Sequence, residues 1–378
     1  MSTIKVNRIE NTSTTDGGVS IDVDGHVTID GQQLPTAGPL SNRNLIINGA
    51  MTIHQRSDNL TDTGFIADRW KFNKRFLDQW VGDVTWETDA PASFSRSIKI
   101  NTTTAETSFE TTEELSLETR IEAQDLQHLD WGTANAKSLT LSFWVKCNKT
   151  GTQSMHVRAH DADHGYSTSY SISSADTWEY KTIVIPGNTA GSITNDNGIG
   201  IWARWVVASG DTAITENAWD TSNNGPYAVS GAMAFGTTIG DYFQITGVQL
   251  EVGSKSTPFE HESYGQTLAK CQRYRYQMDL GSTNNAQHII MTRFELSSGT
   301  AYASIGFPCE MRINPNFTFT GTTQSSTGYA GDPQLSNATK TSCDIRSSRG
   351  VNANATVFVR AVSAPGNDVL VLNWDAEL

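Results

Sequence analysis

The sequence has no long apolar run, few charged residues and few cysteines. Of its 378 residues, 37% are hydrophobic and 18% are charged. No segment approaches the roughly 20 consecutive apolar residues of a transmembrane helix. Residues 1–10 also lack the apolar core of an export signal. We therefore expect no membrane insertion and no signal peptide.

The four cysteines are Cys147, Cys271, Cys309 and Cys343. None is close to another in the sequence, which excludes a Cys-x-x-Cys metal or redox pair. Because we expect no export signal, we predict reduced and mostly buried thiols rather than disulfides.

Positive charge is also scarce. The formal net charge is −13, and residues 41–262 hold 16 basic and 27 acidic residues. An acidic surface argues against nucleic acid or an anionic membrane as a partner. Neutral sugars and proteins remain open as partners.

Signatures of catalysis are missing as well. There is no Ser-His-Asp elbow, no phosphate-binding glycine loop and no zinc signature. We therefore expect no enzyme activity, no cofactor and no metal site.

Three groups of side chains could nevertheless form a metal site or a catalytic site. The histidines and carboxylates of residues 160–164, near Tyr166 and Tyr170, are candidate metal ligands, although a solvated loop is the favoured interpretation. Asp22, Asp24 and Gly25 show part of a calcium-loop pattern, for which a plain turn is favoured. Four glutamates would supply the carboxylate pair of a glycosidase, although an acidic surface is favoured: Glu110, Glu113, Glu114 and Glu118.

Thr, Ser, Asn and 31 Gly are abundant, which favours short strands and turns over helices. The clearest strand lies in residues 240–262, where Phe243 and Ile245 alternate and a second alternating run follows from Val248. Gly247 breaks the alternation as a bulge does, and Pro258 ends the segment. We expect it to close a sandwich whose opening strand is 44–53.

Further strands are expected throughout the chain. In residues 41–262 we predict roughly eight to ten, typical of a jelly roll, including 97–100, 115–121, 139–147, 156–160, 180–185 and 199–207. A hairpin is predicted around Asp24-Gly25 in the leader, residues 1–40. A lone hairpin is marginally stable and needs a partner surface.

A helix over 263–278 is predicted from the spacing of its apolar residues, with Ser263 as N-cap. We assign 263–282 to a linking helix. Residues 283–378 return to alternation, and their strands at 301–307, 315–321, 356–362 and 368–374 predict a smaller β-sandwich.

Several separated motifs resemble one family. Asn44-Leu-Ile-Ile-Asn-Gly-Ala-Met-Thr-Ile-His-Gln-Arg56 with Ala67-Asp-Arg-Trp70 resembles the opening of the jelly-roll module of bacteriophage tail-fibre and receptor-binding proteins. Val248-Gln-Leu-Glu-Val-Gly253, then Thr257-Pro-Phe-Glu260 and Cys271-Gln-Arg-Tyr274, resemble its close. Phe307-Pro-Cys-Glu-Met-Arg312 resembles the start of the distal β domain.

The resemblance implies a jelly roll similar to carbohydrate-binding modules, a homotrimeric fibre and a place in the virion tail after synthesis in the host cytoplasm. The leader would attach to other tail or baseplate proteins, and the β domains would meet a host-surface glycan or protein. A glycan-binding module is the alternative function, and a polysaccharide depolymerase a less favoured one.

Four aromatic residues are candidates for stacking on sugar rings: Trp202, Trp205, Trp219 and Tyr227. Filling of the core is the favoured alternative. Because Trp202 and Trp205 are three positions apart on one predicted strand, they point to different faces, so we expect at least one of them outside the core.

Overall fold

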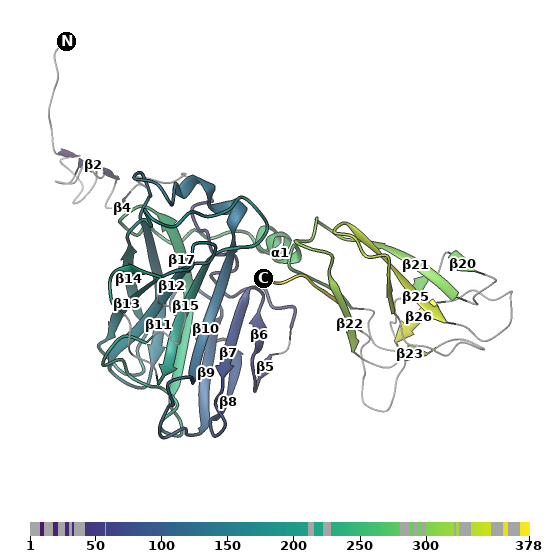
Figure 1. Cartoon of the computed structure of the whole chain (residues 1–378), viewed down its shortest axis with the longest axis horizontal. Coiled ribbons are helices and arrows are strands. Elements are labelled where there is room, and N and C mark those ends of the chain that lie inside the picture. Colours follow the sequence, from purple (N-terminus) through teal and green to yellow (C-terminus); the bar gives the residue numbers. More distant parts are fainter. Residues whose placement is uncertain are drawn as a thin grey trace, which may run out of the picture. The chain divides into compact units, whose positions relative to one another are not determined.

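The computed structural model describes residues 8–10, 18–21, 27–29, 32–33, 42–56, 58–210, 215–221, 228–279, 288–290, 293–295, 300–320, 323–324, 334–348, 358–361 and 371–378. The chain divides into two compact units, Met1–Glu262 and Ser263–Leu378 (Figure 1). The described residues are almost entirely in strands, turns and loops. The predicted all-β class is therefore confirmed.

Besides a small leader sheet, the first unit contains two larger antiparallel sheets within the described residues. Seven strands form one sheet, in the order β16 (Trp219–Asp220), β13 (His164–Ile172), β12 (Gly151–Ala159), β15 (Ile199–Ser209), β10 (Glu114–Glu122), β7 (Trp70–Arg75) and β6 (Gly64–Ala67). Six form the other, in the order β14 (Glu179–Ile185), β11 (Leu139–Cys147), β17 (Tyr242–Val252), β9 (Ser97–Thr104), β8 (Val81–Glu87) and β5 (Asn59–Leu60). A short 3₁₀ helix, Ala123–Leu129, follows β10 (Figure 1).

The two sheets pack face to face around one apolar core. Phe143 of β11 meets Trp205 of β15 edge to face at 5.6 Å between ring centroids, and meets Tyr170 of β13 at 5.1 Å. Trp205 also lies 5.5 Å from Trp70 of β7. Offset and edge-to-face pairs of this kind stabilise a core beyond simple area burial. The arrangement is the jelly-roll sandwich expected from the alternating strands.

β17 confirms the predicted bulge. The core-facing residues of both its runs, from Phe243 to Val252, belong to the apolar core. Gly247 has φ = 60°, and the register with β11 shifts by one residue beside it. Glycine is required there because an added Cβ would lie 2.6 Å from Cζ of Phe94.

The predicted opening strand is not a strand. Residues 44–53 form turns and irregular backbone, yet they hydrogen-bond to β17: the Leu45 N–H donates to the Leu250 carbonyl at 2.8 Å, and the Val248 N–H donates to the Gly49 carbonyl at 2.9 Å. The segment therefore closes the domain through single hydrogen bonds rather than a strand ladder.

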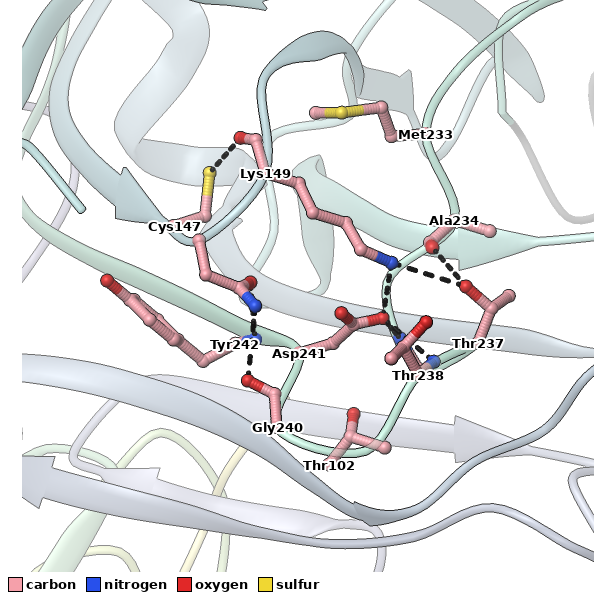
Figure 2. Close-up of polar contacts among 12 residues, drawn as sticks. Thr102, Cys147, Lys149, Met233, Ala234, Thr237, Thr238, Gly240, Asp241 and Tyr242 are labelled. Carbon is pink, nitrogen blue, oxygen red and sulfur yellow. Dashed lines mark hydrogen bonds and ion pairs between the residues drawn. The ribbon is translucent and has the colours of Figure 1, made fainter. Parts of the chain in front are cut away.

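A second tie fixes the start of β17 (Figure 2). The buried Asp241 carboxylate accepts from the Lys149 ammonium at 2.5 Å and from the Thr238 N–H at 3.0 Å. The Asn148 amide brackets the same turn, accepting from the Tyr242 N–H at 3.0 Å and donating to the Gly240 carbonyl at 3.2 Å. Together these bonds hold the turn before β17 against the end of β11.

The leader hairpin is confirmed where it is described. β2 (Gly18–Ile21) pairs antiparallel with β3 (Val27–Ile29), and β1 (Arg8–Glu10) and β4 (Gln32–Gln33) extend the sheet on either side. The turn itself, with the calcium-loop candidates of residues 22–25, lies outside the described residues.

The helix of the second unit, α1 (Tyr264–Gln272), is shorter than predicted. Ser263 is its N-cap, and its side chain and that of Gln266 form a capping box. The chain then enters β18 (Arg275–Asp279), so the segment 263–282 is part helix and part strand. Strand alternation of Tyr274, Tyr276 and Met278 overrides the helical spacing.

The rest of the second unit confirms the predicted strands. The first of its sheets has the order β18, β27 (Val371–Asp375), β22 (Asn316–Thr320). The second is β19 (His288–Ile290), β26 (Phe358–Ala361), β23 (Thr323–Gln324), and the third is β20 (Arg293–Glu295), β21 (Thr300–Gly306), β25 (Ser342–Ser348), β24 (Gln334–Ser336). The core of this unit gathers around the buried Trp374.

No disulfide joins the four cysteines, all of which lie in described segments. Three of them are buried, as expected, and Cys309 is half-buried. Burial raises the pKa of the Cys147 thiol to about 12 and that of Cys343 to about 11. In the described part of the chain, no helix has the length and apolarity to cross a membrane.

Candidate functional site

The outer face of the seven-stranded sheet is lined with charged residues. On β10 the odd-numbered residues Leu115 to Ile121 point into the core, so Glu114, Glu118 and Arg120 point outward. The same alternation turns Arg204 of β15 outward. The two-residue alternation of the strands therefore places these charged side chains on the outer face of the sheet.

Strand register brings these side chains into rows. Arg204 lies opposite Glu118, and Glu118 lies opposite Lys71 of β7. In the next row, Arg120 lies opposite Trp202. Residues from three strands that are distant in the sequence thus share one patch.

A groove of about 450 Å³ runs over this patch. Its walls are formed by Thr63, Lys71, Asn73, Lys74, Arg75, Phe76, Glu114, Arg120, Trp202 and Arg204. Nearby, the segment after residue 228 covers the same sheet face, since the Val229 N–H donates to Ser154 Oγ at 2.9 Å and Ala228 packs on Val206.

Two buried carboxylates hold the arginines of the groove. Arg204 Nη1 lies 3.2 Å from Glu114 Oε2, and its Nη2 lies 3.5 Å from Glu118 Oε2. Arg120 Nη2 lies 2.8 Å from Glu118 Oε1, and Asn73 Nδ2 also donates to Glu118. Both glutamates are at most 1% exposed. Buried charges need such pairing, because an isolated one costs several kcal/mol.

The Trp202 indole orients the same two arginines. The guanidinium carbons of Arg204 and Arg120 lie over its ring at 3.9 and 4.5 Å from the ring centroid. Cation–π contact of this kind fixes a guanidinium plane. Trp202 therefore supports the arginines, a role different from the predicted stacking on sugar.

Some buried polar atoms of the groove lining have no hydrogen-bond partner among the described residues. They include Oε1 of Glu114, an acceptor, and Nε1 of Trp202, a donor. Both atoms are buried, so a ligand hydroxyl would reach them only as the surrounding long side chains shift. Leaving them unsatisfied costs about 1–3 kcal/mol each, which a hydroxyl-rich ligand would recover in part.

Lys71 lies in the middle of the cationic patch. Burial lowers the pKa of its ammonium, Glu118 across the strand raises it, and Arg120 and Arg204 lower it further, with a net shift downward. Burial is the largest cause of the downward shift, and the two arginines beside Lys71 add to it.

Phe76 is the aromatic residue that sequence reasoning missed. It follows β7 at the edge of the groove, is 63% exposed and has φ = 56°. A left-handed backbone is strained in an aromatic residue, by about 1 kcal/mol or more, and strain of this kind clusters at functional sites. Hydrogen bonds between Thr63 and the backbone of Lys74 hold the preceding strand end. No local sequence signal marks Phe76.

The four predicted aromatic residues do not form one site. Trp202 lines the groove, whereas Trp205 is fully buried in the core and is inaccessible to a sugar ring. The expectation that these two face opposite sides of the strand is confirmed. Trp219 packs against Trp131 and Tyr166, and its Nε1 donates to the Pro186 carbonyl. Tyr227 lies outside the described residues.

Residues 160–163 of the predicted polar loop form a turn, as favoured, whereas the rest of that stretch belongs to the strand His164–Ile172. The turn 160–163 joins β12 to β13, with Asp163 paired to Arg158 and Asp161 accepting from the Thr194 N–H at 2.9 Å. Tyr166 and Tyr170 belong to the core. Within the described segments no three His, Cys, Asp or Glu side chains are grouped as metal ligands.

The four glutamates do not form a single acidic surface. Glu114 and Glu118 are buried in the groove network described above, which contradicts the expectation of a solvated position for these two. Glu113 caps the backbone, accepting from the Glu110 N–H at 2.6 Å. Cross-strand pairing with Arg204 explains the burial that sequence alone did not predict.

A second cavity, of about 510 Å³, lies in the second unit. It is lined by six residues of β22 and β24: Asn316, Phe317, Thr318, Phe319, Gln334 and Leu335. These side chains carry no charge, so the cavity offers less for ligand orientation than the groove of the first unit.

Comparisons with known proteins found no matching family model and no matching curated protein. Similar solved structures include tailspike protein 4 of bacteriophage CBA120 (enzymatically active domain; 15% identity, TM-score 0.30, 56% of this chain and 21% of that one). A putative sugar-binding protein from Bacteroides thetaiotaomicron has 14% identity and TM-score 0.32, over 56% of this chain and 100% of that one. A family 11 carbohydrate-binding module from Clostridium thermocellum, solved with a mixed-linked tetrasaccharide, has 10% identity and TM-score 0.27, over 53% of this chain and 99% of that one. The matched region spans about a fifth of the tailspike chain.

Proposed function

We propose that the chain binds carbohydrate through the groove on its seven-stranded sheet. The observation that carries this proposal is a cavity of about 450 Å³ on a rigid sheet, edged by the exposed Phe76 and lined by hydrogen-bonding side chains. Sugar-binding sites commonly combine an aromatic face with a few convergent polar groups.

Binding to a glycan array, followed by titration of the positive ligands, tests this proposal. We expect Phe76→Ala to weaken binding about five- to tenfold, because the stacking surface is lost. Tyr264→Ala is the matched control, since Tyr264 is an aromatic residue of nearly equal exposure, 64% against 63%, in the other unit. Equal affinity of the two variants, or no glycan bound by the unaltered protein, would contradict the proposal.

We further propose that this binding serves host-surface attachment by a phage tail fibre or a fibre-like tail component. The motifs that carry the family resemblance support it, since they meet in the structure: the Glu260 carboxylate accepts from the Asn44 N–H at 3.0 Å. The leader sheet also exposes Ile9 (63%) and Ile21 (43%), which favours cover by neighbouring subunits or by another tail protein.

Mass measurement in solution tests the assembly. A homotrimer is expected for the full chain, and Ile9→Ser with Ile21→Ser is expected to weaken it if the leader contributes to subunit contact. A stable monomer across micromolar concentrations would argue against a fibre. Electron microscopy of virions with a C-terminal tag would locate the protein in the tail.

The role we propose is binding without cleavage. Glycoside hydrolysis needs one carboxyl to donate a proton and a second to act as base or nucleophile. Glu114 and Glu118 instead both pair with Arg204. Reducing-end assays on bacterial capsule and lipopolysaccharide are expected to show no release, and release abolished by Glu114→Gln would establish a depolymerase.

A further inference from the structure

The groove is cationic although the chain carries a net charge of −13. Its lining includes five cations and one carboxylate, Glu114. Glu118 lies directly beside them, paired with Arg120 and Arg204. Counting both glutamates, the groove keeps an excess of three positive charges.

Those three charges belong to Lys71, Lys74 and Arg75. The two other cations, Arg120 and Arg204, are held by carboxylates and by the Trp202 ring. Within the described residues, no carboxylate lies within ion-pair distance of the three. Lys74 Nζ lies 5.7 Å from the Trp80 ring and Arg75 Cζ 5.1 Å from the Phe76 ring, both aromatic contacts that leave donors available.

The pairing of Arg75 with Phe76 defines the kind of ligand. A guanidinium fork matches a carboxylate or sulfate, and the adjacent exposed ring matches the apolar face of a sugar. The carboxylate of Glu114 within the same groove disfavours a continuous polyphosphate, and its Oε1 would accept a hydroxyl donor once the surrounding side chains shift. Anion and hydroxyls together are the chemistry of an acidic saccharide.

We infer that the groove selects acidic saccharides, with a sugar ring on Phe76 and separate carboxylate or sulfate groups of the chain bound by Arg75 and by Lys71. This inference rests on the proposed carbohydrate-binding function and adds its ligand class.

Matched polymer pairs test the inference with the full chain. Polygalacturonate and its fully methyl-esterified form share a backbone and differ in charge, and dextran sulfate and dextran form the equivalent pair for sulfate. Polyglutamate supplies carboxylates without sugar. Binding is measured by titration calorimetry at low and at moderate salt, because screening weakens contacts between exposed charges.

We expect at least one acidic polymer to bind about tenfold or more tightly than its neutral form, and the difference to shrink with added salt. Lys71→Gln and Arg75→Gln should each weaken acidic-polymer binding about tenfold. Lys99→Gln is the charge-matched control on β9 of the other sheet, where the Lys99 ammonium lies over Tyr242. It should leave the affinity within about twofold.

The outcomes separate this inference from the function on which it rests. Equal or tighter binding of the neutral polymers would overturn acidic selectivity and keep carbohydrate binding. Binding of polyglutamate as tight as that of the acidic polysaccharides would reduce the groove to a cationic patch and overturn the inference. Failure to bind any saccharide would overturn both.

Discussion

Asn44 and Leu250 are joined by a hydrogen bond across 206 positions of the chain: the Leu250 N–H donates to Asn44 Oδ1 at 3.0 Å. The other end of the same side chain donates from Nδ2 to the Val248 carbonyl at 3.0 Å. One asparagine amide therefore substitutes for a neighbouring strand at this position of β17. The domain is closed by side-chain hydrogen bonds at a point where the sequence pattern predicted a strand.

Replacing Asn44 with alanine should therefore destabilise the first unit. The change leaves the Leu250 N–H and the Val248 carbonyl without these partners, which we expect to lower the free energy of unfolding by about 2 kcal/mol or more. Urea unfolding followed by tryptophan fluorescence measures it. Asn135→Ala, at an exposed turn, is the control and should change little. Equal midpoints would show that the Asn44 bridge contributes nothing to stability.

Gly247 and Gly240 allow steric overlap to be separated from backbone strain. Both have positive φ, 60° and 86°. An added Cβ at Gly247 would lie 2.6 Å from Phe94, whereas at Gly240 no atom lies within 4 Å. We expect Gly240→Ala to cost about 1 kcal/mol from strain alone, and Gly247→Ala about 3 kcal/mol because packing is also disturbed. Thermal and urea unfolding of the pair measure the difference, and a Gly240→Ala cost equal to that of Gly247→Ala would rule out the packing contribution.

Much of the sandwich could be predicted from strand alternation, and the exceptions have physical causes. β13 was missed because its outward face is Ser167, Ser169 and Ser171, which makes a polar segment look like a loop. The core-facing residues of β13, which include Tyr166, Tyr170 and Ile172, do recur at every second position. The segment 44–53 was predicted as a strand from its apolar content, but Asn44 and Asn48 satisfy backbone groups locally and favour turns.

The groove could be predicted only in part. The outward position of Trp202 followed from strand parity, but its arginine neighbours depend on the register of β10 against β15, which no local pattern gives. Phe76 is exposed because the chain turns after β7 with a positive φ. Net charge argued against anionic ligands because it averages over the whole surface, whereas the groove gathers five cations from three strands.

The buried His156 makes stability dependent on pH. Burial, together with Arg204 and then Arg158, holds its pKa well below the ordinary value of 6.5. Its Nδ1 lies 2.9 Å from Ser167 Oγ. The folded state keeps the ring neutral while the unfolded chain takes up a proton below about pH 6.5, so the unfolded state binds more protons there. Stability is therefore unaffected by this group above that pH and falls as the solution is acidified.

Urea unfolding at pH 7.5, 6.5 and 5.5 measures this effect. One buried histidine contributes a loss of up to about 1.4 kcal/mol per pH unit below its unfolded pKa. Burial lowers the pKa of His128 and His160 as well. The unfolding free energy of the whole chain should therefore fall with decreasing pH more steeply than one histidine alone would cause. His156→Gln should flatten the profile by about one proton. A variant whose slope matches that of the unaltered chain would contradict the assignment to His156.

The second unit should fold alone only if β18 is kept. β18 pairs with the central strand β27 residue by residue, from Arg275 opposite Asp375 to Asp279 opposite Val371. The Tyr276 ring also stacks on Trp374 at 5.4 Å. A fragment of residues 263–378 retains these contacts, whereas a fragment beginning at 283, the boundary predicted from sequence, loses the strand and exposes one edge of β27.

Trp374 is the sole tryptophan in either fragment, so its fluorescence reports the core directly. We expect a cooperative urea transition for 263–378, and for 283–378 a red-shifted emission with no cooperative transition. Equally cooperative transitions would show that β18 is dispensable, and the absence of a transition in both would show that the second unit depends on the rest of the chain or on its assembly.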